Sequence, residues 1–477
     1  MGFIKGKDRY QVSLLPPVID DYIDKDDEVR IIDSFVNKLD IKFQYSDFNG
    51  RGNQPYNPQD LLKIYIFCYL NSIRSSRKIE KECQSNIKLI WLINGLKPDD
   101  RTICDFRKNN KEQLCQVLKI FTSICQKANL FSAELIAIDG SKFKASNSIN
   151  KVYSKKILKN KIQFINESIN NYLNEIEKND TVEMKIQKAS SEKIHEIINK
   201  LEKEKDGYKK LLEEFKELEE TQISITDKDC RIMHKRNGEV NPSYNVQIAS
   251  DSKNNMIVDF DISNKANDIQ ELSNIAKKAK EVLNTNELTV IADAGYFNRD
   301  EFEKCINNNI TPIVNKPKVS KHNKKFSKDR FVYDPNNDLY ICPAKRKLYF
   351  VKEELYNTKK RKQKRRSYIE KNKCSECEFR QQCFQNKKSY RKITRWYKED
   401  IVDNMQTLKS IEKLKKRKQI IEPIFGIIKN CFGFNTFLTR GLENVKTEFS
   451  LQALVYNLKR AINILGIQNL LLAINNN

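Results

Sequence analysis

The spacing of the apolar residues first changes near residue 135, and that change limits the possible folds most. Between about residues 28 and 130 they recur at helical spacing, for example at Ile31, Phe35 and Leu39. From Leu135 onward they fall into short runs that are typical of strands. The sequence therefore predicts an all-helical first part, followed by a part that contains a sheet.

The helical first part carries its own start signals and basic connections. Pro58 stands where a helix would begin, because proline suits the first helical turn. Ser76 is a candidate cap for the next helix, and Glu80 is the candidate partner in a capping box. Arg74 and Arg77 belong to a basic patch, residues 74–78, at the junction of these two helices. We expect residues 1–130 to form a helical DNA-binding domain, and the alternative is a role in packing alone.

Beyond residue 135 the expected elements follow an order that is informative about topology. Strands are predicted at 135–138, 244–249 and 256–260, then a helix at 268–283, a strand ending before 293, a helix at 299–307 and a strand at 311–314. This order predicts an α+β or α/β fold with a mixed sheet flanked by helices. A ribonuclease H-like core has the same order, and we assign it to residues 131–470.

Two segments interrupt the predicted sheet domain. Residues at about 150–226 mix apolar positions with Lys and Glu, which predicts an inserted helical hairpin. Residues at about 318–395 are strongly basic and contain the clustered cysteines. Within them, the basic run 359–366 suits contacts with a phosphate backbone, and the alternative is a solvated loop. A second basic run, 413–418, precedes Glu422 and favours DNA contact.

Three carboxylates stand in settings that suit metal-dependent cleavage of phosphodiesters. Asp139 and Asp293 each end an apolar run, and Glu422 opens a helix-like stretch. Mg²⁺ prefers carboxylate oxygens, and two such ions can activate water and neutralise a leaving oxyanion. The alternative is structural, because Asp in a turn after a strand is common. Glu412 and Glu448 are the main rivals for the role of Glu422.

The charge of the chain limits its partners. Its 477 residues carry a formal net charge of +24, which favours nucleic acid or an anionic membrane surface. No apolar stretch is long enough for a membrane helix, and the N-terminus lacks the apolar core of a signal peptide. We therefore expect a soluble, cytoplasmic protein whose 12 cysteines form no disulfide framework.

Several motifs together resemble the transposases of bacterial insertion sequences that use a DDE active site. The N-terminal segments 11–17, 56–62 and 70–77 resemble the opening and the helical domain of that family. Residues 137–144, 243–247, 292–297 and 422–429 resemble the segments that carry or flank its catalytic acids. The resemblance covers nearly the whole chain. It implies that Asp139, Asp293 and Glu422 are the catalytic residues and bind Mg²⁺ or Mn²⁺.

The family's signature around the glutamate is matched only in part. Six residues separate Glu422 from Lys429, as in the family, but Lys415 and Lys418 stand where it has Tyr and Arg. A contact with the DNA end would then fall to Lys418, Arg417 or Arg440. The remaining DNA-binding candidates are Arg74, Arg77, Lys142 and Lys429.

The resemblance implies DNA recombination by transposition. The reaction would be hydrolysis at the ends of the element, followed by attack of the freed 3′-hydroxyl on target DNA. The partners would be the terminal inverted repeats, the target DNA and a second copy of the chain in a dimer or larger assembly. Two alternatives stay open: a metal-dependent nuclease without strand transfer, and an inactive or domesticated DNA-binding protein.

One group of cysteines stands apart from the scattered ones. Cys374 and Cys377 form a C-x2-C pair, Cys383 follows, and Cys342 lies upstream. Four thiolates can bind structural Zn²⁺ tetrahedrally, although a single C-x2-C pair is a weaker signal than two. The alternative is that these cysteines are free and reduced.

Overall fold

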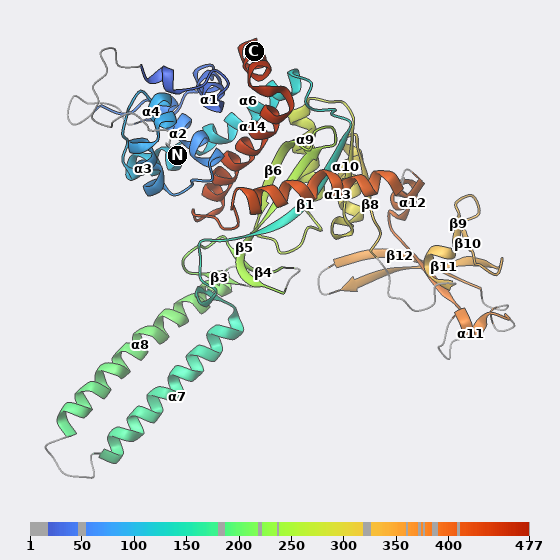
Figure 1. Ribbon diagram of the computed structural model, residues 1–477. Coiled ribbons are helices and arrows are strands. Elements are labelled where there is room, and N and C mark those ends of the chain that lie inside the picture. The colour runs from blue at the N-terminus through green and yellow to red at the C-terminus, as the bar shows by residue number, and fades with distance from the viewer. Residues whose placement is uncertain are drawn as a thin grey trace, which may run out of the picture.

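A computed structural model describes most of the chain. The described residues are 18–45, 54–179, 187–217, 222–235, 238–317, 326–358, 361–370, 374, 377–383, 390–407 and 411–476. Figure 1 shows a helical module, a central sheet crossed by long helices, a projecting helical hairpin and a second, smaller sheet. The fold therefore combines helices with several sheets, as the sequence predicts for an α+β protein.

Within the described residues, the N-terminal module contains a short 3₁₀ segment, η1 (Ile19–Tyr22), and six helices. The helices are α1 (Glu28–Asn37), α2 (Pro58–Leu70), α3 (Ser76–Ser85), α4 (Ile87–Leu92), α5 (Asp100–Asn109) and α6 (Lys111–Lys127). Pro58 opens α2 as predicted, and the Asn57 side chain caps it. The predicted cap of α3 is wrong by one residue, because the helix already includes Ser76 and Ser75 takes the N-cap position without a side-chain bond.

The last helix of the chain closes this module. Helix α14 (Leu442–Asn475) packs against α6, α2 and α1, and also against the central sheet. Its residues from Thr447 to Leu458 are all buried, as expected for a helix that is surrounded on every side. The helical part of the protein is therefore built from both ends of the sequence, and α14 joins it to the sheet.

The central sheet has six strands, and its pairing is mixed. They are β1 (Leu135–Lys144), β4 (Arg231–His234), β5 (Val240–Asp251), β6 (Ile257–Ser263), β7 (Leu288–Ala292) and β8 (Ile310–Val314). β5 pairs antiparallel with β1, β4 and β6, whereas β1, β7 and β8 are parallel. Helices α9 (Leu272–Leu283) and α10 (Arg299–Asn307) connect β6 to β7 and β7 to β8. The predicted order of strands and helices is confirmed, and β4 is an addition that the sequence analysis missed.

Strand β1 is longer than its apolar run suggests. Its pairing with β7 ends at Ala137, but its pairing with β5 continues to Lys144. Asp139 therefore lies inside the strand, and the expectation that it ends one is wrong. The hydrogen bonds from β5 keep the backbone extended after the apolar residues stop, which the pattern of β1 alone does not reveal.

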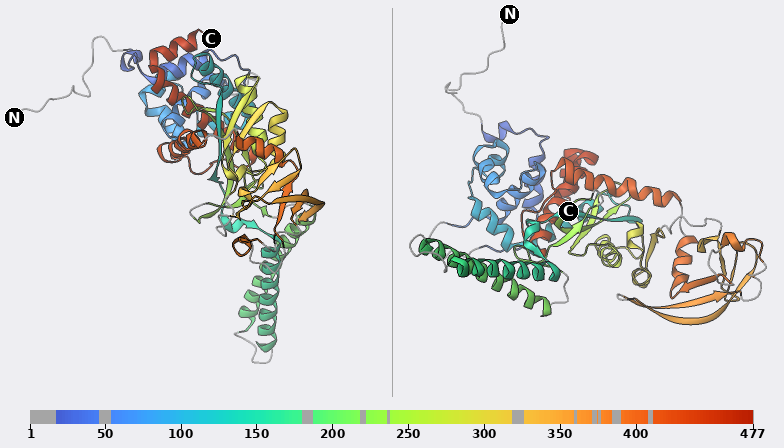
Figure 2. Two further views of the ribbon diagram at one scale, coloured as in Figure 1. Left: turned by 90° about the vertical axis from the view of Figure 1, so that its right-hand side faces the viewer. Right: turned by 90° about the horizontal axis from the view of Figure 1, so that it is seen from below.

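A helical hairpin leaves the sheet between β1 and β4. Helices α7 (Lys155–Asn179) and α8 (Gln187–Glu217) pack on each other around a separate apolar cluster that includes Leu158, Ile165 and Phe215. At its base, η2 (Ile149–Lys151) leads into β2 (Val152–Tyr153), which pairs with β3 (Ile223–Ser224). The hairpin projects from the rest of the molecule in all three views (Figures 1 and 2).

The basic segment forms a second sheet, which the sequence analysis did not predict. Its strands are β9 (Val332–Asp334), β10 (Leu339–Ile341), β11 (Lys347–Thr358), β12 (Arg361–Ile369) and β13 (Lys392–Trp396). The segments η5 (Lys328–Arg330), α11 (Arg380–Cys383) and α12 (Glu399–Thr407) flank it. A small core that includes Tyr340, Leu348 and Tyr368 stabilises it. Residues 361–366 therefore belong to a strand, not to a solvated loop, while 359–360 lie outside the described residues.

Two further helical segments complete the path between the sheets. Helix α13 (Ile411–Gly426) crosses the central sheet in contact with β1, β5 and β7, and the π-helical turn η6 (Ile427–Cys431) continues it.

In the part of the chain that the structure describes, no helix combines the length and apolar character that crossing a membrane requires.

Candidate active site

Asp139 and Asp293 come from neighbouring parallel strands. Asp139 lies on β1, two residues after the last pair with β7, and Asp293 directly follows β7 as the N-cap of η3 (Ala294–Tyr296). Each carboxylate accepts a backbone N–H close to itself, from Gly140 at 2.9 Å and from Gly295 at 2.8 Å. Burial raises the pKa of Asp139, and the charge of Asp293 adds to that increase. The two carboxylates therefore lie near enough to repel each other.

Arg417 is the direct partner of Asp139. Its Nη1 lies 2.7 Å from Asp139 Oδ2, and the two side chains are only 10% and 17% exposed. This pair lowers the pKa of Asp139, in opposition to burial. Arg417 was expected to contact DNA, but here its guanidinium neutralises a candidate metal ligand. It therefore competes with a cation for the same oxygen.

Glu422 lies within α13 and is exposed. The expectation that it opens a helix is wrong, because α13 begins at Ile411 and continues past Pro423. A proline inside a helix leaves the carbonyl four residues earlier without its backbone donor. Here that carbonyl, of Gln419, accepts a hydrogen bond from the Asn255 side chain at 3.2 Å. This contact helps to explain why the helix tolerates proline next to Glu422.

The two aspartates and Glu422 do not form a closed metal cage in this structure. No group of three or more His, Cys, Asp or Glu side chains lies close enough to hold a metal ion in the described ranges. The sheet brings Asp139 and Asp293 together, and α13 brings Glu422 across the same sheet. A cage would therefore require the side chains to move, with Arg417 leaving Asp139.

The rivals of Glu422 differ in what the structure says of them. Glu448 is fully buried and accepts the backbone N–H groups of Leu438 and Thr439, the Thr439 hydroxyl and the guanidinium of Arg74. Its oxygens hold a loop in place, so it is a structural residue. The side chain of Glu412 lies outside the described residues.

Lys429 is a half-buried cation beside β1. Its Nζ donates to Ser141 Oγ at 2.6 Å and to the Lys142 carbonyl at 3.2 Å, and it lies 4.4 Å from the centre of the Phe143 ring. Burial lowers its pKa to about 8, with a further effect from the charge of Lys235. No carboxylate within the described ranges lies within 4 Å of this ammonium group. The ammonium group therefore lies against the strand that carries Asp139, beside Ser141 two residues further along it.

The other predicted DNA-binding residues differ in accessibility. Arg74 is 13% exposed; it contacts Glu448 and the Thr436 carbonyl and lies over the Phe434 ring. This side chain links the helical module to the loop before α14. Arg77, Lys418 and Arg440 are largely or wholly on the surface, although Arg77 pairs with Asp100 and Arg440 donates to the Ser146 carbonyl. Lys142, half-buried, donates to the His234 carbonyl.

The four clustered cysteines gather beside the second sheet. Cys342 and Cys383 pack against its core, and the Cys342 sulfur accepts the Arg346 N–H at 3.3 Å. Burial raises the pKa of the Cys383 thiol, Arg391 opposes the increase, and the other three cysteines add to it. The donor set suits zinc, but the sulfurs do not converge into a metal-binding group in this structure.

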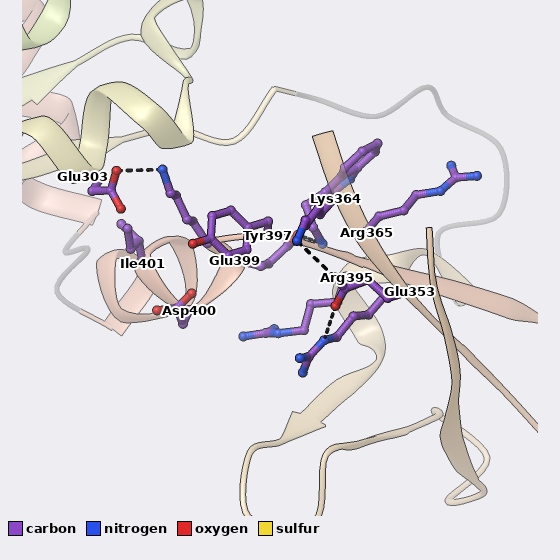
Figure 3. A pocket seen from close by; sticks show the side chains of 12 residues that line it. Glu303, Glu353, Lys364, Arg365, Arg395, Tyr397, Glu399, Asp400 and Ile401 are labelled. Atoms are coloured by element: carbon purple, nitrogen blue, oxygen red, sulfur yellow. Dashed lines mark hydrogen bonds and ion pairs between the residues drawn. The ribbon is translucent and has the colours of Figure 1, made fainter. Parts of the chain in front are cut away.

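A cavity of about 510 Å³ lies between the second sheet and helices α10 and α12. Figure 3 shows its basic side chains next to acidic ones. Arg366 pairs with Glu353, and Lys398 pairs with Glu303. The cations that line this cavity are largely neutralised within the protein, so it is a weaker candidate for phosphate binding than its basic sequence suggests.

The sequence analysis missed a set of polar residues under the two aspartates. Asp268 precedes α9 and accepts hydrogen bonds from Asn245 and Gln247, while the Tyr296 hydroxyl donates to Gln247. Asn245 and Gln247 stood out only as part of a resembling motif, and Asp268 only as the expected start of a helix. Their meeting depends on strand register and was not visible in either segment alone.

Comparisons with known families match two parts of the chain, one in the helical module and one that includes α13. Residues 17–109 match the family described as Transposase domain (DUF772), and residues 341–462 match the family described as Transposase DDE domain. The second match includes Glu422 and Lys429, whereas Asp139 and Asp293 lie before it. Neither the search of curated proteins nor the search of solved structures found a match.

Two transposase domains in one chain indicate a transposase. More specifically, the two matches support an insertion-sequence transposase of the DDE type.

Proposed function

We propose that this transposase cuts DNA at the ends of its insertion sequence and joins the freed 3′-hydroxyl to target DNA. Asp139, Asp293 and Glu422 would hold the divalent metal ions, Mg²⁺ or Mn²⁺. The observation that carries the proposal is the placement of two aspartates on adjacent parallel strands, crossed by the helix that bears the glutamate.

The topology supports the same proposal. The strand order β6-β5-β1-β7-β8, with three antiparallel strands followed by two parallel ones, is the order of a ribonuclease H-like core. On this interpretation residues 131–470 form the catalytic domain, and residues 150–226 and 318–395 are insertions into it. Residues 1–130 would form the DNA-binding domain, completed by α14.

The chemistry of the residues fits a divalent cation. Carboxylate oxygens are the donors that Mg²⁺ prefers. Asp139 is held beside a second carboxylate, and burial raises its pKa, so a cation at this position would relieve an unfavourable charge. When bound, the metal would activate water and neutralise the leaving oxyanion. Arg417 would keep Asp139 neutralised until then.

The surrounding cations would position the DNA. Lys429 would hold a phosphate beside β1, because its ammonium group is partly desolvated and has no carboxylate partner within the described ranges. Lys418 and Arg440, both exposed, would contact the backbone farther from the cleavage point. Two DNA ends require two active sites, so we expect at least a dimer on DNA.

The test is a cleavage assay on duplex DNA that carries the ends of the element. We expect Mg²⁺-dependent nicking at those ends and joined products when target DNA is added. Asp139→Asn, Asp293→Asn and Glu422→Gln should each abolish nicking while DNA binding persists. Normal nicking by these variants would refute the site, and nicking without joined products would favour the nuclease alternative.

The clustered cysteines carry a separate and smaller proposal. We propose that Cys342, Cys374, Cys377 and Cys383 bind one structural Zn²⁺ beside the second sheet. The other three cysteines lie close enough to Cys383 to raise its pKa, which supports this zinc site. Elemental analysis of protein purified without chelators should find one zinc per chain, and its absence would leave these cysteines as free thiols.

A further inference from the structure

A buried polar network lies beneath the proposed active site. Asp268 Oδ1 accepts hydrogen bonds from Asn245 Nδ2 at 2.8 Å and from Gln247 Nε2 at 2.7 Å. Gln247 Oε1 in turn accepts the hydroxyl proton of Tyr296. Asn245, Gln247 and Tyr296 are 1%, 0% and 0% exposed. The network therefore ties β5, the segment before α9 and the turn after β7 into one unit.

Asp268 is the member of this network that touches the backbone beside both aspartates. A Cβ added at Gly140, next to Asp139, would meet Gln247 Nε2 first and would lie 2.7 Å from Asp268 Oδ1. A Cβ added at Gly295 would lie 2.9 Å from Asp293 Oδ1 and 3.7 Å from Asp268 Oδ2. The carboxylate of Asp268 thus occupies the space between two glycines that each supply a backbone N–H to a candidate metal ligand.

The physical cost of disturbing this network is high. A buried amide without a partner loses the hydrogen bonds that it would make in water, and a partly satisfied network is worse than none. Without Asp268, Gln247 would keep only its bond from Tyr296, and Asn245 only its 3.2 Å contact with the Lys265 carbonyl. Both amides would then have to rearrange. Gln247 pairs with Gly140 in the sheet and accepts the hydroxyl proton of Tyr296, which follows Asp293, so the rearrangement would reach the backbone beside both aspartates.

We infer that Asp268 is a positioning residue for the metal site. This inference rests on the proposed function, because it presumes that Asp139 and Asp293 bind the metal. Asp268 holds Asn245 and Gln247 with one oxygen and so sets the spacing of the β1 and β7 segments that carry the two ligands. Its role depends on its hydrogen-bond acceptor, whereas that of the two ligands depends on their charge.

The test separates these two roles with Asp268→Asn and Asp268→Ala in the full chain. Asparagine keeps one acceptor oxygen for both amides but removes the charge, whereas alanine removes the acceptor. Mn²⁺ binding, followed by electron paramagnetic resonance, is the main readout, and DNA nicking is the second. We expect Asp268→Ala to lower Mn²⁺ affinity roughly 10- to 100-fold, as is usual for residues that support metal ligands. Asp268→Asn should restore most of that affinity.

Two controls keep the outcomes distinct. Asn245→Ala removes one of the two donors to Asp268, so it should lower Mn²⁺ affinity in the same direction but by less, and it replaces Asp268→Ala if that variant does not fold. Folded Asp268→Ala or Asn245→Ala with unchanged affinity would overturn the inference. So would Asp268→Asn as weak as Asp139→Asn, because Asp268 would then act as a ligand. A wild-type chain that binds Mn²⁺ no better than Asp139→Asn would instead refute the proposed function.

Discussion

Replacing Lys429 with methionine should stabilise the DNA-free protein and weaken its binding to DNA. Methionine keeps the length of the side chain and its contact with Phe143, but removes a half-buried charge. The charge is unfavourable in the folded protein, since burial lowers the pKa of Lys429 from 10.5 to about 8. The same charge is what would attract a phosphate, so stability and binding are expected to change in opposite directions.

The magnitude follows from the lowered pKa. One pKa unit corresponds to about 1.4 kcal/mol, so the full change would be on the order of 3 kcal/mol. Because the side chain keeps contact with water, screening reduces this to about 1–2 kcal/mol of added stability for Lys429→Met at pH 7.

The pH dependence of the free energy of unfolding gives the sign of the expected change in stability. Between about pH 8 and 10.5, Lys429 binds fewer protons in the folded than in the unfolded state, so the free energy of unfolding of the wild type rises with pH. Below pH 8 the lysine is charged in both states and the unfavourable contribution is present in full. The advantage of Lys429→Met should therefore be complete at pH 7 and fade toward pH 10.5.

The assay is chemical denaturation of both proteins at pH 7 and pH 10, with DNA binding measured in parallel at pH 7. Lys418→Met is the matched control for stability, because it removes an exposed lysine from α13, the helix that η6 continues, and should change stability by no more than about 0.5 kcal/mol. A stability difference that is the same at both pH values would refute the reasoning. Unchanged DNA binding would remove Lys429 from the phosphate site.

Three further changes test other parts of the structure. Arg417→Met leaves the buried carboxylate of Asp139 without its partner, so the free energy of unfolding of the metal-free protein should fall by about 3 kcal/mol. Mg²⁺ should then raise the melting temperature of this variant more than that of the wild type. An equal rise would argue against competition between Arg417 and the cation. Gly140→Ala places a methyl group against Asp268 Oδ1 and should lower both melting temperature and Mn²⁺ affinity, whereas Gly207→Ala, with open space around it in α8, should stabilise by up to about 1 kcal/mol. Cys377→Ser should abolish zinc binding in elemental analysis, and zinc retained by this variant would exclude that thiolate as a ligand.

Elements of the helical module and of the central sheet could be predicted where local patterns specify them. Helices α2 and α10 begin next to residues with strong start signals, and strands β7 and β8 coincide with their apolar runs. The second sheet was missed for a physical reason. Its strands β11 and β12 carry many charged residues, so no apolar run marks them, although they are neighbours in the sequence and pair with each other as a hairpin.

The candidate site divides in the same way. The sequence pointed to Asp139, Asp293 and Glu422 because each follows or lies beside an apolar segment with a recognisable motif. It did not reveal that Arg417 pairs with Asp139, since 278 positions separate the two residues. Nor did it show that the oxygens of Glu448 accept a hydrogen bond from the backbone of a loop, at Leu438, and pair with Arg74.

The class of protein, the order of the elements of the central sheet apart from β4, and three candidate catalytic acids could all be predicted from the sequence alone. Periodicity and short motifs are local, so one segment at a time is enough to recognise them. Tertiary structure decided how far β1 extends, which cation neutralises Asp139 and that Asp268 lies between the two glycines. These properties arise from strand register and from a helix crossing the sheet, and each depends on contacts between segments far apart in the chain.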